Sequence, residues 1–157
     1  MCELLELKVG DIVLEIGAGS GYHAAICSEI IAPQKNSENK NAGHVYTVER
    51  ISELAEFAKN NLAKSSYSEI VTVIEGDGTL GYPEKAPYDA ILVTAAGPKV
   101  PEPLIEQLKV GGKLVIPIGP RGMYQELILI EKVKPDKVIQ KKVGGVAFVP
   151  LIGEHGW

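Results

Sequence analysis

The sequence predicts an α/β domain with a doubly wound, mostly parallel seven-stranded sheet that ends in an antiparallel C-terminal hairpin. Two observations predict this fold. Short β-branched segments alternate with helical segments along most of the chain, which favours parallel strands joined by crossovers. The last two apolar segments are joined only by a short turn around Pro135 and Asp136, which is too short for a crossover. Together these features are typical of a Rossmann-like sheet with a hairpin at one edge.

The expected elements follow one another in a regular order. Strands are expected at residues 12–16, 44–49, 70–75, 88–96, 111–119, 125–133 and 138–149, and helices at 22–32, 51–64 and 101–108. The helix at 51–64 is the clearest, because Leu54, Phe57, Ala58 and Leu62 share one stripe. Residues 33–43 are polar, lack periodicity and exceed the usual length of such a connection. We expect them to be a surface loop inserted into a single domain spanning 1–157.

Composition narrows the classes of function. The formal charge is −4 and the basic residues are scattered, so the sequence shows no electrostatic footprint for nucleic acid. No apolar stretch is long enough to cross a bilayer. The two cysteines, Cys2 and Cys27, are too few for a disulfide framework or a four-cysteine zinc site. We therefore expect a cytoplasmic protein that holds no metal and binds neither nucleic acid nor membranes.

A glycine-rich turn lies between the first strand and the first helix. Gly17, Gly19 and Gly21 form a G-x-G-x-G pattern, in which glycine permits a tight turn and a close approach to a ligand. Nicotinamide and flavin sites usually show G-x-G-x-x-G, so the third glycine comes one residue early here. This spacing, preceded on the strand by Glu15, is common in sites for S-adenosylmethionine. Taken alone, the turn is also compatible with a ligand-free βα connection.

Three later positions favour an adenosyl cofactor. Glu49 ends the second strand, where its carboxylate can accept hydrogen bonds from both ribose hydroxyls. Asp77 follows the third strand and can accept from the adenine amino group, and the small residues 94–96, beginning with Thr94, close the fourth strand. Open α/β sheets bind ligands at these carboxyl ends, so we expect one shared cleft. The predicted cofactor site comprises Glu15, Gly17, Ala18, Gly19, Ser20, Gly21, Glu49, Arg50, Asp77, Gly78 and Thr94.

Several segments together resemble one family. "VLEIGAGSGY", "VYTVER", "GDGTLGYPEKAPYDAILVTAA", "VPEPLIEQLKVGGKLVIPIG" and "VAFVPLIG" are similar to the protein-L-isoaspartate O-methyltransferase family. The resemblance implies methyl transfer from S-adenosylmethionine to the free carboxylate of L-isoaspartyl residues, with damaged, isoaspartyl-containing proteins as partners. It also implies an acceptor side formed by Thr94, Ala95, Phe148, Val149, Pro150 and Leu151.

The resemblance also implies a difference. Family members carry a further N-terminal segment with a short serine-containing motif that covers the cofactor, whereas Met1 of this sequence matches a position interior to the family pattern. The family's catalytic serine is therefore expected to correspond to a position upstream of Met1. No serine of the chain matches that motif, so we expect no catalytic residue here and little transfer without a cover.

The expected methyl transfer requires no acid–base group from the protein. A carboxylate acceptor is ionised at neutral pH and needs no general base, so catalysis is expected to come from positioning and the exclusion of water. The histidines His23, His44 and His155 are widely separated and are expected to be packing or surface residues. Two alternatives stay open: a cofactor-binding remnant without turnover, and a small-molecule carboxyl- or O-methyltransferase. A nucleic-acid amino-methyltransferase is disfavoured, because residues 94–98 read TAAGP.

Overall fold

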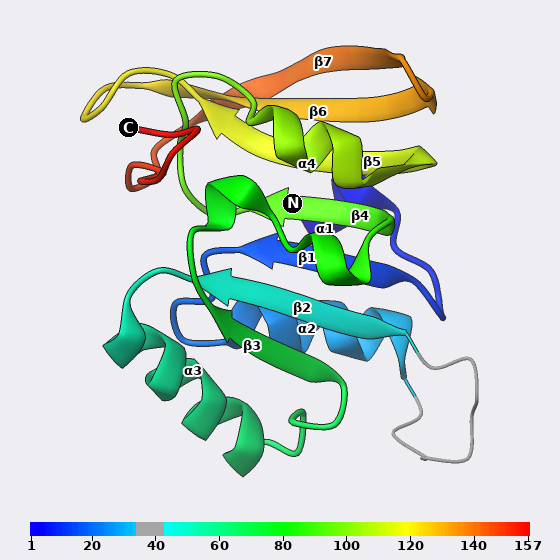
Figure 1. Cartoon of the computed structure of the whole chain (residues 1–157), viewed down its shortest axis with the longest axis vertical. Coiled ribbons are helices and arrows are strands. Elements are labelled where there is room, and N and C mark those ends of the chain that lie inside the picture. Colours follow the sequence, from blue (N-terminus) through cyan, green and yellow to red (C-terminus); the bar gives the residue numbers. More distant parts are fainter. Residues whose placement is uncertain (34–42) are drawn as a thin grey trace.

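A computed structural model describes residues 1–33 and 43–157. Seven strands form one sheet in the order β3-β2-β1-β4-β5-β6-β7 (Figure 1). The strands are β1 (Ile12–Ile16), β2 (His44–Glu49), β3 (Val71–Glu75), β4 (Tyr88–Val93), β5 (Leu108–Ile118), β6 (Gln125–Lys134) and β7 (Lys137–Val146). The first five run parallel, and β6 and β7 run antiparallel to their neighbours. The predicted fold class is confirmed, and the order of the last strands, which the sequence leaves open, is β5-β6-β7.

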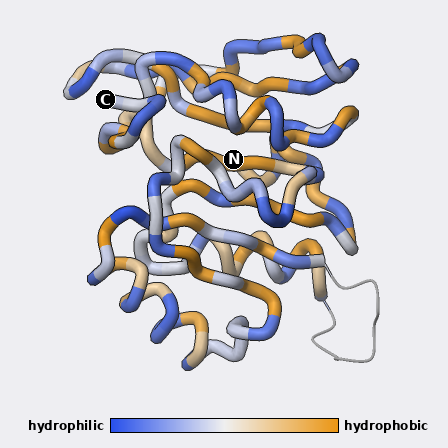
Figure 2. The backbone as a smooth tube through the Cα atoms, viewed as in Figure 1, coloured by the Kyte–Doolittle hydropathy of each residue, from blue (hydrophilic) through white to orange (hydrophobic). Residues whose placement is uncertain are grey.

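Helices cover both faces of this sheet. They are α1 (Cys2–Leu5), α2 (Tyr22–Ile31), α3 (Ser52–Lys64) and α4 (Glu102–Gln107), with two short 3-10 turns, η1 (Gly78–Leu80) and η2 (Pro83–Lys85). Apolar side chains of α1, α2 and α3 pack with Val13 and Val45 on one face, whereas α4 packs with Leu14 and Ile116 on the other. Figure 2 shows the resulting hydrophobic centre of the sheet, with hydrophilic residues toward the surface. Alternation along each strand thus supplies two core layers.

Several element boundaries differ from expectation, among them the end of β4, which is at Val93 rather than at residue 96. The helix predicted to reach Leu108 ends at Gln107, and β5 begins at Leu108 rather than at Gly111, because β5 pairs with β4 from its first residue. Strand β7 ends at Val146, so Phe148 lies in the segment that follows it. Helix α1 and the two 3-10 turns were not predicted, since each is too short to show helical periodicity.

Two expectations concern the chain as a whole. The inserted loop was predicted at residues 33–43, of which 34–42 lie outside the described residues. In the described part of the chain, no helix has the length and apolar character needed to cross a membrane. We propose that residues 1–157 form one domain, since all seven strands belong to a single sheet.

Candidate functional site

A cavity of about 460 Å³ lies at the carboxyl ends of β1, β2 and β4. Its volume is in the range of sites for small molecules. The lining residues are Ile16, Gly17, Gly19, Val48, Glu49, Arg50, Ile51, Leu54, Gly78, Thr94, Ala95, Val149, Pro150, Leu151 and Ile152. Most of the predicted cofactor and acceptor residues therefore meet in one place.

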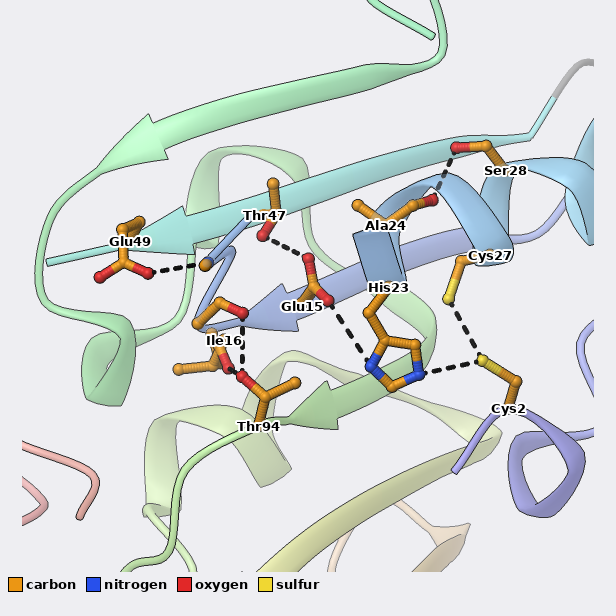
Figure 3. A network of polar contacts seen from close by, with 12 residues as sticks. Cys2, Glu15, Ile16, His23, Ala24, Cys27, Ser28, Thr47, Glu49 and Thr94 are labelled. Carbon is orange, nitrogen blue, oxygen red and sulfur yellow. Dashed lines mark hydrogen bonds and ion pairs between the residues drawn. The ribbon is translucent and has the colours of Figure 1, made fainter. Parts of the chain in front are cut away.

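The glycine-rich turn is fixed against the end of β4. Gly17 has a φ of +97°, and a Cβ built there would overlap the Oγ1 of Thr94. That hydroxyl donates to the carbonyl oxygens of Ile16 and Gly17, both at 2.9 Å (Figure 3). Only glycine meets both the backbone conformation and the space at this position. The turn therefore brings bare backbone to the cavity wall.

The carboxylate of Glu49 is held at the edge of the same turn. Its Oε2 accepts from the backbone N–H of Gly19 at 3.1 Å, and its Oε1 accepts from that of Ile51 at 3.1 Å. The residue is only 6% exposed, yet it lines the cavity. Each oxygen can accept a further hydrogen bond, so this carboxylate can bind a vicinal diol of a ligand.

Six predicted site residues do not line the cavity: Glu15, Ala18, Ser20, Gly21, Asp77 and Phe148. Glu15 lies on the face of β1 that carries α2, because side chains alternate along a strand. Its Oε2 accepts from Thr47 Oγ1 at 2.6 Å, and its Oε1 lies 3.8 Å from His23 Nδ1 (Figure 3). Burial raises the pKa of Glu15 to about 7.

Asp77 holds the end of the chain. Its Oδ1 accepts from the N–H and the hydroxyl of Thr79, at 2.8 and 2.7 Å, and its Oδ2 accepts from the N–H of Glu154 at 2.8 Å. Burial acts to raise the pKa of Asp77, but these hydrogen bonds outweigh it and hold that pKa below its usual range. The neighbouring Gly78 lines the cavity instead.

Met1, upstream of which the resemblance placed the catalytic serine, also lies away from the cavity lining. It is partly buried and packs against the core layer that contains Leu5 and Ala24, on the face of the sheet that carries α2. Its carbonyl accepts from the N–H of Leu4 at 3.0 Å, which starts the first turn of α1. The contacts of Met1 are therefore those of a packing residue. The expectation that no residue of this chain takes the catalytic role of the family's serine stays a prediction.

The C-terminal segment forms one wall of the cavity by pairing with the chain after β4. The N–H of Ala96 donates to the carbonyl of Val149 at 2.7 Å, and the N–H of Leu151 donates to the carbonyl of Ala96 at 2.8 Å. These bonds form a parallel bridge between Ala96 and Pro150. Residues from the far end of the sequence are thereby placed beside Thr94.

Sequence reasoning missed five apolar residues of the lining. These residues are Ile16, Val48, Ile51, Leu54 and Ile152. In the sequence they have the pattern of ordinary core positions in a strand or on a helical stripe, so periodicity alone does not distinguish them. Their position beside Gly17 and Glu49 was the one available signal. Among the described residues, no group of three His, Cys, Asp or Glu side chains could hold a metal ion.

Sequence comparison identifies relatives over the whole chain. The model of the family "Protein-L-isoaspartate(D-aspartate) O-methyltransferase (PCMT)" matches residues 1–156. A protein-L-isoaspartate O-methyltransferase of Staphylothermus marinus is 59% identical over 157 residues, which cover all of this chain and 68% of that protein. The corresponding protein of Hyperthermus butylicus is 56% identical over 157 residues. The chain spans 64% of the length of the Hyperthermus protein.

Solved structures agree with the sequence comparison. A protein-L-isoaspartate O-methyltransferase superposes with a TM-score of 0.86 at 34% identity, covering 99% of this chain and 46% of that one. A putative one from Plasmodium falciparum, in complex with S-adenosyl-L-homocysteine, gives 0.79 at 28% identity and covers 96% of this chain and 68% of its own. From the family match and the identity to these relatives, we conclude that the chain belongs to the protein-L-isoaspartate(D-aspartate) O-methyltransferase family.

Proposed function

We propose that this chain binds S-adenosylmethionine in the cavity and serves methyl transfer to the free carboxylate of L-isoaspartyl residues in damaged proteins. The observation that carries the proposal is the Glu49 carboxylate, which is nearly buried at the wall of the cavity beside the glycine-rich turn. Membership of the family supports the reaction and the substrate class.

The residues of the cavity fit the cofactor. Glu49 has acceptor capacity for two ribose hydroxyls, and the apolar side chains of Val48 and Leu54 suit an adenine ring. Gly78 has no side chain at a point where a Cβ would overlap Ile16, so backbone approaches the cavity there as well. When bound, S-adenosylmethionine supplies an electrophilic methyl group on its sulfonium. In this proposal, the predicted cofactor residues outside the lining hold the lining residues in place without contacting the cofactor. They are Glu15, Ala18, Ser20, Gly21 and Asp77.

The acceptor side of the cavity is formed by Thr94 and by small or apolar residues. Thr94, Ala95 and the segment 149–151 line it. Phe148 lies just outside: its N–H donates to Gln125 Oε1 at 2.6 Å, and Gln125 Nε2 donates to its carbonyl at 3.1 Å. A carboxylate acceptor arrives ionised at neutral pH, so no side chain needs to remove a proton. In the proposed reaction, this wall removes water from the acceptor carboxylate and aligns that carboxylate with the methyl group.

Calorimetric titration with S-adenosylhomocysteine tests the binding site. Glu49→Gln is expected to weaken binding by about tenfold or more, because one acceptor oxygen and the negative charge are lost. Glu75→Gln is the matched control, since Glu75 is the partner of Glu49 in the β2–β3 register but is exposed and outside the cavity. Equal effects of the two substitutions, with both variants folded, would contradict the site.

A methyl-transfer assay tests the substrate class. We expect only weak transfer by this chain, with the labelled methyl appearing on a peptide containing L-isoaspartate and not on the same peptide containing L-aspartate. Equal labelling of both peptides, or of small carboxylic acids alone, would indicate a small-molecule methyltransferase. Binding of S-adenosylhomocysteine with no labelled product would indicate a cofactor-binding protein without turnover.

Three further expectations stay predictions from the sequence. They are a cytoplasmic location, the absence of a nucleic-acid partner and the absence of a membrane partner. The proposed reaction needs only the cofactor and the isoaspartyl substrate, so the two assays above do not depend on these expectations.

A further inference from the structure

A cluster of thiols and an imidazole lies on the face of the sheet that carries α2, apart from the cavity lining. Cys2 on α1 has its Sγ 3.7 Å from the Sγ of Cys27 and 3.2 Å from the Nε2 of His23 (Figure 3). His23 and Cys27 are four residues apart on α2 and so share one side of that helix. Glu15 on β1 lies behind His23, with its Oε1 3.8 Å from Nδ1.

The surroundings of the two thiols differ in charge. The pKa of Cys2 is lowered to about 4 by the hydrogen bond from Cys27, against the effect of burial, with a further lowering by His23. The same contact and burial raise the pKa of Cys27, while Cys2 raises that of His23. These shifts all favour a Cys2 thiolate beside a His23 imidazolium, with Cys27 as the protonated donor.

The two thiols also differ in their access to solvent. Cys2 is partly exposed, whereas Cys27 is fully buried. An oxidant from solvent therefore meets the thiolate first, and the buried thiol is already in contact with it. Low-pKa, accessible thiols beside a second cysteine are the arrangement found in redox-sensitive pairs.

We propose that Cys2 and Cys27 form a redox pair in which a hydroperoxide oxidises Cys2 and Cys27 then closes a disulfide between α1 and α2. In the first step the Cys2 thiolate attacks hydrogen peroxide, the O–O bond breaks, and Cys2 becomes a sulfenic acid while hydroxide leaves. In the second step the Cys27 sulfur attacks the Cys2 sulfur, the S–O bond breaks, and the thiol proton leaves with the hydroxyl group as water. The sulfurs must move from 3.7 Å to the bonded distance of about 2.05 Å.

This inference is independent of methyl transfer, and it is tested on the full chain with reductant removed. Equimolar hydrogen peroxide is expected to give a monomer that has lost two hydrogen atoms, with peptides containing Cys2 and Cys27 joined in a map made without reductant. The thermal midpoint is expected to rise by several degrees, because the cross-link constrains the unfolded chain, and dithiothreitol should reverse the rise. Cross-links between chains, or sulfinic acid at Cys2 with a free Cys27, would overturn the proposal.

Variants separate the roles of the three side chains. In Cys27→Ala, oxidation is expected to stop at a Cys2 sulfenic acid that dimedone traps. His23→Gln should slow disulfide formation at pH 6 by at least about tenfold and raise the pH midpoint of Cys2 alkylation, because the cation beside the thiolate is lost. His44→Gln, a matched change on β2 away from the thiols, should alter neither value. An unchanged midpoint in His23→Gln would contradict the role of the imidazole.

Discussion

Two carboxylates at the ends of neighbouring strands have opposite surroundings. Glu49 faces the cavity and accepts from two backbone N–H groups. Glu15, near the end of β1, is fully buried toward α2, and its Oε1 has no hydrogen-bond partner among the residues that the structure describes, although it lies near His23. The parity of a residue along its strand decides which face it meets. Burial without full hydrogen bonding makes Glu15 a titrating group inside the protein.

We predict that Glu15→Gln stabilises the protein at alkaline pH relative to the unmodified chain. The folded protein keeps the Glu15 proton up to a pKa of about 7, whereas the unfolded chain loses it near 4.5. The folded state therefore binds more protons in that window, and the free energy of unfolding falls as the pH rises through it. The glutamine has no charge to bury, so the variant is expected to gain up to about 3 kcal/mol relative to the parent between pH 4 and pH 8.

Denaturant unfolding at a series of pH values measures this gain. Glu69→Gln serves as the control, because Glu69 is exposed in the loop before β3. A difference between Glu15→Gln and the parent that stays constant from pH 4 to pH 8 would show that Glu15 does not titrate in the folded protein near neutrality.

At the scale of elements, the short helix α4 is terminated by a buried lysine from a distant strand. Lys132 on β6 is only 7% exposed, and its Nζ donates to the carbonyl oxygens of Ile105 and Leu108, both at 2.8 Å, and of Glu106 at 3.2 Å. The last carbonyls of a helix lack partners within it, and a cation there also complements the helix dipole. Lys132 thus joins α4, β5 and β6.

We predict that Lys132→Met lowers the free energy of unfolding by about 3 kcal/mol. The methionine fills similar space but leaves buried carbonyl groups without their donor. Lys134→Met, at an exposed position two residues along the same strand, is the control and should have little effect. Guanidinium unfolding midpoints compare the two variants, and equal losses in both would rule out the capping role of Lys132.

At the scale of the whole molecule, the cavity depends on hydrogen bonds that hold the C-terminal segment against the rest of the fold. Asp77 accepts from the N–H of Glu154, Thr79 Oγ1 accepts from the N–H of His155 at 3.1 Å, and the indole N–H of Trp157 donates to the carbonyl of Ala96 at 3.1 Å. These bonds fix the segment that continues from the 149–152 wall of the cavity. Its position is therefore set by contacts with the connections that follow β3 and β4 rather than by its own sequence.

We predict that Asp77→Ala loosens this segment before any ligand is bound. Hydrogen exchange should become faster at the amides of Leu151, Glu154 and Trp157 in the ligand-free protein, and the affinity for S-adenosylhomocysteine should fall as the wall becomes mobile. Asp136→Ala, in the exposed turn between β6 and β7, is the control. Loss of affinity with unchanged exchange would show instead that Asp77 acts by direct contact with the ligand.

Much of the architecture follows from local patterns in the sequence. The alternation of β-branched and amphipathic segments determined the doubly wound sheet, and the short turn near Pro135 determined the hairpin. The G-x-G-x-G spacing and the acid at position 49 pointed to the end of the sheet where the cavity lies. These signals were readable because strand period and turn chemistry depend on neighbouring residues, and because ligands of open α/β sheets bind at the carboxyl ends of the strands.

Other features were decided only when distant segments packed together. The use of Asp77 to hold Glu154 and the contact between the two thiols each join residues far apart in the chain, and the turning of Glu15 toward His23 depends on how α2 packs against β1. No local pattern encodes such pairs, because each depends on which face of an element is buried and on what lies against it. The sequence by itself determined the sheet and the edge that carries the site, and the tertiary structure decided which side chains reach it.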